Sequence, residues 1–196
     1  MTTTTNVILC GTGGQGILLA SEVISYAAMA SGMDVKKSEV HGMAQRGGSV
    51  SSHVRFGEKV YSPLVEKGTA DMILAMEMME GVRWAPFLSP GGRLIIPDLE
   101  INPMTVNTGQ AEYPDVVALL DGQSIPYSQV PAYGIASELG NLRVLNVVLL
   151  GAVSSWIDRI PEENWLAALE ERVPARALEV NMTAFRRGRT LTLGQR

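Results

Sequence analysis

The sequence predicts an α/β protein with a Rossmann-like, mostly parallel sheet, helices on both faces and additional C-terminal helices. Short apolar runs that end at glycine or proline alternate along the chain with longer segments of helical periodicity. The first apolar run leads into GTGGQG at residues 11–16, which has the spacing G-x-G-x-x-G. A length of 196 residues, 46% hydrophobic, suits a single domain over residues 1–196.

The N-terminal segment has the pattern of a β-α-β unit. Residues 6–10 (NVILC) form a short apolar run stopped by glycine, which predicts a buried strand. Apolar and small residues recur at helical spacing over 14–31, and Gly32 follows as a stop signal. Residues 33–40 (MDVKKSEV) are expected to form a strand near the surface, because they include two lysines. A right-handed parallel crossover is the default connection.

The next segment combines a loop with a predicted hairpin. Residues 41–48 (HGMAQRGG) are expected to form the loop. Small polar and apolar residues alternate over 49–56 (SVSSHVRF), which favours a strand with one wet or interfacial face. GEK at 57–59 predicts a hairpin turn, and 60–63 would be the returning strand.

The rest of the chain continues the alternation and ends in helices. Apolar runs predict strands at 70–75, 93–97 and 123–128, with a turn at 90–92. Helices are expected at 77–88, 114–121, 131–139, 143–157, 162–172 and 175–187. The methionines at 72, 76, 78 and 79 and Cys10 are interpreted as core residues.

Composition excludes several classes of protein. A net charge of −4 argues against general nucleic-acid binding. A single cysteine excludes an intrachain disulfide and an all-cysteine metal or iron–sulfur site within one chain, and it favours a cytoplasmic location. The N-terminal residues lack the pattern of a signal peptide, and no apolar run approaches the ~20 residues that span a membrane. The spacing of His41 and His53 does not suit a metal site.

The glycine turn raises the possibility of a bound dinucleotide. Gly11 would allow the tight turn, Gly13 a close backbone approach and Gly16 the packing of helix on strand. A dinucleotide fold also needs an acidic residue at the end of the second strand, where Glu39 could serve and Asp34 lies too early. The large Gln15 inside the motif counts against a nucleotide. A turn with no ligand stays open as an alternative.

A second glycine segment follows the second predicted strand. Arg46 precedes Gly47 and Gly48, which places a guanidinium beside exposed backbone N–H groups, a pairing that suits a carboxylate or a phosphate. We expect this loop to lie near the same C-terminal sheet edge as the first. Arg46 could instead anchor a subunit interface.

Five segments together resemble a known family. They are GTGGQGI (11–17), EVHGMAQRGGSVSSHVR (39–55), ADMILAMEMMEGVR (70–83), PGGRLII (90–96) and LGNLRVLNVVLLGA (139–152). In this order they resemble the gamma domain of the pyruvate/ketoisovalerate type of 2-oxoacid:ferredoxin oxidoreductases, and most of all the beta subunits of the indolepyruvate branch. The likeness covers nearly the whole chain.

The resemblance implies a subunit of an oxidoreductase. A larger partner subunit would carry thiamine diphosphate, Mg and iron–sulfur clusters, would decarboxylate a 2-oxoacid to an acyl-CoA, and would pass electrons to ferredoxin. This chain would bind no cofactor alone, supply no catalytic residue and be inactive when isolated. Its role would be to shape the active site on the side of coenzyme A. An isolated chain could form a homodimer through the surface meant for the partner.

The resemblance also implies which residues line that site. They are Gly11, Gly13, Gly14, Gln15, Gly16, Gln45, Arg46, Gly47, Gly48 and Ser49, with Gly42 matching as well. Arg46 would contact a phosphate of coenzyme A or the substrate carboxylate. His41 and Ala44 depart from the family pattern and leave the choice of 2-oxoacid open. Glu77 could cap backbone amides at the sheet edge, and Asn146 is as easily a packing residue as a site residue.

Two rival functions stay open at this point. One is a Rossmann-type protein that binds NAD or FAD, and the other is a non-catalytic assembly module whose glycine loops only dock on partners.

Overall fold

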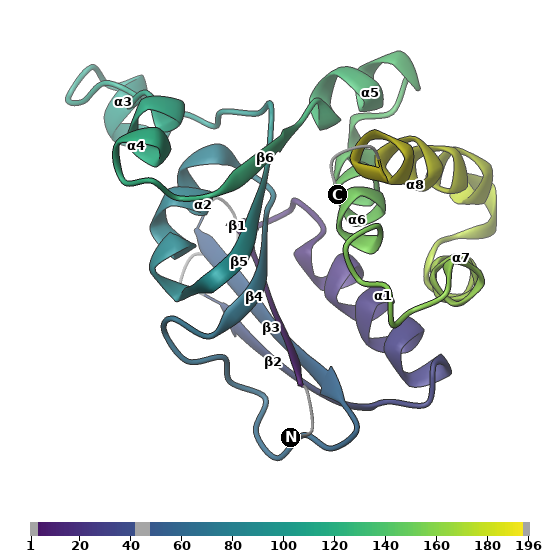
Figure 1. Cartoon of the computed structure of the whole chain (residues 1–196). Helices are drawn as coiled ribbons and strands as arrows, with labels where there is room; N and C mark the ends of the chain where they lie inside the picture. The colour runs from purple at the N-terminus through teal and green to yellow at the C-terminus, as the bar shows by residue number, and fades with distance from the viewer. Residues whose placement is uncertain (1–3, 42–47, 194–196) are drawn as a thin grey trace.

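The computed structural model describes residues 4–41 and 48–193, which fold around one six-stranded sheet (Figure 1). The spatial order of the strands is β2-β3-β1-β4-β5-β6. Their bounds are β1 Thr5–Thr12, β2 Asp34–His41, β3 Ser49–Gly57, β4 Ala70–Ala75, β5 Leu88–Pro97 and β6 Tyr127–Val130. The helices are α1 Ile17–Ala30, α2 Met78–Trp84, α3 Met104–Asn107, α4 Val116–Gly122, α5 Ala132–Glu138, α6 Leu145–Ser154, α7 Glu162–Arg172 and α8 Leu178–Leu193. Three short 3₁₀ turns are η1 Ala85–Phe87, η2 Leu142–Val144 and η3 Ala175–Ala177.

The sheet is mostly parallel, as predicted. β1, β4, β5 and β6 pair in parallel, whereas β3 pairs antiparallel with both β1 and β2. β2 therefore runs in the same direction as β1 but lies one strand further out. The β-α-β unit is present, with β3 inserted between its two strands.

The predicted hairpin at 57–59 is wrong, because residues 60–63 form no returning strand. Side chains hold the backbone of this segment instead. The Asp34 carboxylate accepts the Val60 N–H at 3.0 Å, and the Arg55 guanidinium donates to the Ser62 and Leu64 carbonyls at 3.0 and 3.2 Å. With its edges already paired by β1 and β2, β3 has no free side for a further strand.

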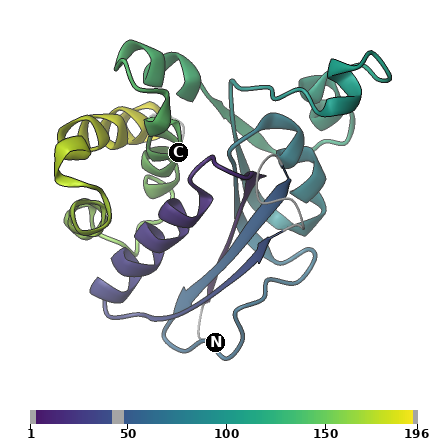
Figure 2. The same ribbon diagram turned by 180° about the vertical axis from the view of Figure 1, so that it is seen from behind.

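The predicted wet face of β3 is also wrong. Ser51, Ser52 and His53 are buried, because both faces of this inner strand are covered. Alternate side chains of β1 show the two layers: Val7 and Leu9 join the core beneath α1 and α6, whereas Ile8 and Cys10 join the core beneath α2 and α4. Figure 2 shows the same two layers from behind.

Several element bounds differ from the sequence prediction for local reasons. The helix expected over 14–31 begins at Ile17, because Gly14 and Gly16 have positive φ angles and form the turn. The strand expected over 123–128 is shifted to Tyr127–Val130, because Ser124 adopts a positive φ of 53° just after α4. The predicted turn at 90–92 lies within β5, where the register to β4 shifts.

The core residues were well predicted. Cys10 is fully buried, and burial is the main reason that the pKa of its thiol is raised well above the ordinary value. Met72, Met76 and Met78 are buried too, and Met79 is partly buried against the same layer as Cys10. Within the described residues, no helix is both long enough and apolar enough to cross a membrane.

Candidate functional site

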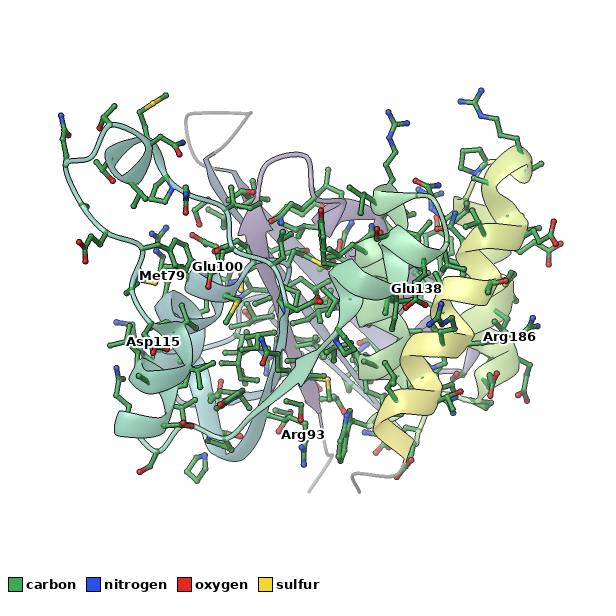
Figure 3. The ribbon with its side chains drawn as sticks, turned by 90° about the horizontal axis from the view of Figure 1, so that it is seen from above. Met79, Arg93, Glu100, Asp115, Glu138 and Arg186 are labelled. Carbon is green, nitrogen blue, oxygen red and sulfur yellow. The ribbon has the colours of Figure 1, made fainter. Side chains whose placement is uncertain are left out.

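The described loops at the carboxyl ends of the parallel strands meet at one edge of the sheet. β1, β4 and β5 end at this edge, and β3, which runs the other way, begins there. Figure 3 looks onto it: Met79 and Glu100 lie on one side of the sheet, and Glu138 and Arg186 on the other. Open α/β sheets bind their ligands outside the carboxyl ends of their strands, so this edge is the candidate site.

Close contacts explain why glycine occupies two positions of the turn between β1 and α1. Gly16 has φ +78°, and a Cβ built on it would lie 2.2 Å from Nδ2 of Asn146. That Asn146 amide donates to the Gly16 carbonyl at 3.2 Å. Asn146 therefore packs against the glycine turn and holds the start of α1. At Gly11 a Cβ would lie 2.6 Å from Oε1 of Gln15, so this glycine makes room for the glutamine.

Gln15 points into the sheet edge and ties two strands together. Its Oε1 accepts the Thr12 N–H at 2.6 Å, and its Nε2 donates to the Met76 carbonyl at 2.7 Å. The side chain thus replaces backbone bonds that the ends of β1 and β4 cannot make to each other. The Gln15 side chain is long enough to reach the ends of both strands, which explains why a large polar residue occurs within the glycine motif.

The start of α1 is left open toward a cavity. Gly16 offers no side-chain cap, and the first turn of α1 has no acidic residue. A cavity of about 310 Å³ borders the turn and is lined by Thr12, Gly13, Gly14, Gly16, Ile17, Leu18 and Val50. Free N–H groups at a helix start favour an anion, so this end of α1 suits an anionic ligand.

The second glycine motif meets the first at this edge. The Gly13 N–H donates to the Gly48 carbonyl at 3.0 Å, and Thr12 pairs with Ser49 in the sheet. The expectation that the two loops share one sheet edge is confirmed for Gly48 and Ser49. The predicted site residues Gly42, Gln45, Arg46 and Gly47 lie outside the described residues.

Two buried carboxylates organise the neighbouring part of the edge. Glu77 caps α2 through the Glu80 N–H at 2.9 Å and also accepts the Ile101 N–H at 3.3 Å. It therefore caps backbone amides, as the sequence suggested. Glu80, which sequence reasoning missed, accepts the Ser49 hydroxyl at 2.7 Å and pairs with Arg83 at 2.7 Å. The only sequence signal for Glu80 is its place three residues after Glu77.

The described residues lack the acidic partner that a dinucleotide site has beside its glycine turn. β3 separates β1 from β2, so the end of β2 is displaced from the turn by two strand spacings, roughly 9.6 Å. Glu39 lies within β2 and pairs with Lys37 at 2.7 Å. Asp34 is the first residue of β2 and so lies at the ends of the strands opposite to the glycine turn. Its hydrogen bond with Lys36 is the main reason that its pKa falls to about 2. Neither carboxylate lies next to the turn, where a Rossmann site has its ribose partner.

His53 is a core residue. It is 5% exposed, its Nδ1 accepts the Val65 N–H at 3.0 Å, and its ring packs edge-on against Trp84 and Phe87. Burial lowers the pKa of His53 below its ordinary value of 6.5. Among the described residues, no group of three His, Cys, Asp or Glu side chains is placed to hold a metal ion.

The buried histidine predicts a pH-dependent stability. The unfolded chain takes up a proton near the ordinary pKa, whereas the folded chain resists it, so the free energy of unfolding falls as pH drops below about 6.5. One such group changes that free energy by at most about 1.4 kcal/mol per pH unit. Urea unfolding at pH 7.5 and 5.5 should show a smaller difference for His53→Phe than for the wild type. Equal differences would contradict the assignment.

The arrangement as a whole defines a class of protein: a Rossmann-like α/β chain whose glycine turn presents backbone at a sheet edge, with no carboxylate of residues 4–41 and 48–193 in the usual place of a ribose partner. The chain belongs to the pyruvate ferredoxin/flavodoxin oxidoreductase family, which matches residues 6–191.

Curated relatives match the chain nearly end to end. It is 38% identical over 191 residues to the indolepyruvate oxidoreductase subunit IorB of Thermococcus kodakarensis, with 93% of each chain covered. It is 37% identical to the subunit of the same name from Pyrococcus horikoshii, with 92% of each chain covered. The 2-oxoglutarate synthase subunit KorC of Methanothermobacter thermautotrophicus is 28% identical, over 94% of this chain and 93% of that one.

Solved structures share the fold. The gamma subunit of a keto/oxoacid ferredoxin oxidoreductase from Geobacter sulfurreducens aligns with a TM-score of 0.71 at 23% identity, covering 97% of this chain and 99% of that one. A 2-oxoglutarate:ferredoxin oxidoreductase chain from Magnetococcus marinus aligns with a TM-score of 0.76 at 22% identity. The alignment covers 97% of this chain but 31% of that one.

Proposed function

We propose that the chain is the small subunit of a 2-oxoacid:ferredoxin oxidoreductase that acts on indolepyruvate. The observation that carries this is the identity of 34–38% to four indolepyruvate oxidoreductase subunits over more than nine-tenths of the chain. Identity to the 2-oxoglutarate synthase subunits is lower, at 26–30%. Aryl pyruvate is therefore the favoured substrate class.

The redox and decarboxylation chemistry belongs to a larger partner subunit in this proposal. The chain has a single cysteine, and Cys10 is buried with a raised thiol pKa, so its side chains do not fit an iron–sulfur cluster. Thiamine diphosphate, Mg and the clusters would be held by that partner, which passes electrons to ferredoxin. The chain works in the cytoplasm as one gamma-type domain over residues 1–196.

The contribution of this chain is to shape one wall of the active site. The open start of α1 offers N–H groups to an anion beside the joined glycine loops, and the second motif contains Arg46, whose guanidinium suits the same ligand. Coenzyme A, as co-substrate, approaches from this side. Arg46 holds either its phosphate or the carboxylate of the 2-oxoacid.

The test is a reconstitution of activity. The chain is purified without oxygen both alone and with its large subunit, and dye reduction is measured with indolepyruvate and coenzyme A. Activity is expected only from the pair, and indolepyruvate should outperform pyruvate, 2-oxoisovalerate and 2-oxoglutarate. A pair that prefers another 2-oxoacid would overturn the substrate assignment, and an isolated chain that binds NAD or FAD would overturn the family role.

The variant Arg46→Ala separates an active-site wall from a mere docking module. We expect it to raise the KM for coenzyme A or indolepyruvate in the assembled enzyme by about tenfold, because one charge-assisted contact is lost. A variant that weakens assembly but leaves KM and kcat unchanged would favour the docking module.

A further inference from the structure

The two outer strands of the sheet, β2 and β6, differ in how they are protected from pairing with another chain. β6 has only four residues, Tyr127–Val130, and it lies between Pro126 and Pro131. Short length and flanking prolines are two of the devices that keep an edge strand from pairing. β2 has eight residues and no proline. In the part of the chain that the structure describes, no strand pairs with its outer side, so β2 is the edge that can accept a further strand.

The lysines of β2 do not protect it as edge lysines usually do. Lysine on an edge strand prevents pairing because it brings an uncompensated charge against the incoming strand. In β2, Lys36 pairs with Asp34 at 2.7 Å, and Lys37 pairs with Glu39 at 2.7 Å. These four side chains therefore carry no net charge. Val40, near the end of the same strand, is 52% exposed and adds an apolar contact surface.

Two-fold symmetry limits how β2 could pair with β2 of a second copy. Antiparallel pairing about an axis perpendicular to the sheet keeps each face of the sheet on the same side in both copies. Because side chains alternate between the two faces, one residue of the strand must then lie opposite its own copy. The registers that pair most of β2 are centred on Lys37 and on Ser38. The first opposes two lysines, and like charges directly opposite each other destabilise a sheet.

The register centred on Ser38 is complementary in charge. It places Lys37 opposite the second copy's Glu39, and by symmetry Glu39 opposite the second copy's Lys37. Opposite charges in directly facing positions stabilise an antiparallel pair. The same register places Lys36 opposite the second copy's Val40, where the aliphatic part of the lysine can cover the exposed valine. The sequence of β2 thus fits a second copy of itself.

We propose that β2 pairs antiparallel with β2 of a second copy in the register centred on Ser38, which joins two six-stranded sheets into one. The two-fold axis reverses the direction of the strands, so the carboxyl ends of β1, β4 and β5 point in opposite directions in the two copies. Each candidate site stays at an outer edge of the joined sheet. The dimer therefore leaves both sites open to a large subunit.

A disulfide at the symmetry axis tests the register. Directly opposed Cα atoms of antiparallel strands are about 4.5–5.5 Å apart, within the range that a disulfide spans. Mild oxidation of the full-length variant Ser38→Cys should therefore give a covalent dimer. Val40→Cys is the matched control on the same face of β2, because it lies four residues, roughly 13 Å, from the position opposite its own copy. The native Cys10 is fully buried, so the wild type should not cross-link.

Charge reversal tests the complementarity, with sedimentation equilibrium of the full-length chain as the measurement. Lys37→Glu and Glu39→Lys each place like charges opposite each other at two symmetric positions, so each should weaken dimerisation by at least about tenfold. An equimolar mixture of the two variants restores opposite charges at both positions. It should form a heterodimer about as tightly as the wild type dimerises, which also shows that both variants are folded.

Lys67→Glu supplies a control for net charge. Lys67 is exposed in the segment between β3 and β4, away from β2, and its reversal should change the dimerisation constant by less than about twofold. The proposal is overturned if the wild type sediments as a monomer or if Val40→Cys cross-links as readily as Ser38→Cys. It is also overturned if both charge variants dimerise like the wild type, or if their mixture remains monomeric.

Discussion

Replacing Gly188 by alanine is expected to lower the free energy of unfolding by about 3 kcal/mol or more, one of the largest effects of any single methyl group in this chain. α6 and α8 cross so closely that a Cβ on Gly188 would lie 1.9 Å from the Val148 carbonyl oxygen. The same contact recurs in reverse, since a Cβ on Gly151 would lie 2.0 Å from the Phe185 carbonyl oxygen. Both obstacles are backbone atoms, which cannot rotate away as a side chain could.

The free energy should be measured by urea unfolding, with Gly122→Ala as the matched control. Gly122 ends α4, and a Cβ built on it meets nothing within 4 Å, so alanine there should be neutral or slightly stabilising. The double variant Gly151→Ala/Gly188→Ala should lose less than the sum of the two single losses, because one separation of the helices relieves both clashes. A loss below about 1 kcal/mol for Gly188→Ala would mean that α6 and α8 can move apart freely.

The sequence was sufficient for the elements whose signals are local. β1, the glycine turn and α1 follow from an apolar run, a glycine motif and helical periodicity. α7 was predicted at its observed bounds, Glu162–Arg172, because prolines at 161 and 174 frame it. The core assignments of Cys10 and the buried methionines also held, since these residues sit within apolar runs.

The errors arose where pairing partners are distant in sequence. No local sequence signal indicates that β3 is inserted between β1 and β2. Its serines therefore predict a wet face, and the GEK segment predicts a hairpin turn. The candidate site shows the same limit. Gln15 and Gly48 follow from motifs, whereas Ser49 and Glu80 are hydrogen-bonded only because the start of β3 lies beside α2 in the folded chain. No spacing along the sequence brings residues on two separate elements together.

Glu77 is the residue whose loss should most disturb the sheet edge itself. Its side chain is 2% exposed and accepts the Glu80 N–H, the Ile101 N–H and the Tyr113 hydroxyl. Burial, followed by the hydrogen bond to Glu77, raises the pKa of Tyr113, so the phenol stays a proton donor. One carboxylate thus joins α2, the segment 98–103 that follows β5, and the segment before α4.

Glu77→Ala is expected to lower the free energy of unfolding by about 3 kcal/mol, because three donors lose a buried acceptor at once. Glu77→Gln should cost less, since the amide keeps one oxygen but turns an NH₂ group toward a donor. Tyr113→Phe removes a single bond and should cost about 1 kcal/mol. Urea unfolding gives this order, and hydrogen exchange should show faster exchange at Ile101 in both Glu77 variants but not in Tyr113→Phe.

The order of the losses in free energy of unfolding, more than their size, shows whether Glu77 caps α2 alone or joins three segments at the sheet edge. If Glu77 acts only as the cap of α2, Glu77→Ala would cost about 1 kcal/mol, as an ordinary capping residue does, and exchange at Ile101 would be unchanged. If it joins three segments, the cavity of about 410 Å³ that Glu77, Ser49, Ile101 and Asn107 help to line would lose a wall when the carboxylate is removed. The assembled enzyme carrying Glu77→Ala should then show a raised KM for coenzyme A or indolepyruvate. The measurement is made at temperatures at which the variant is still fully folded.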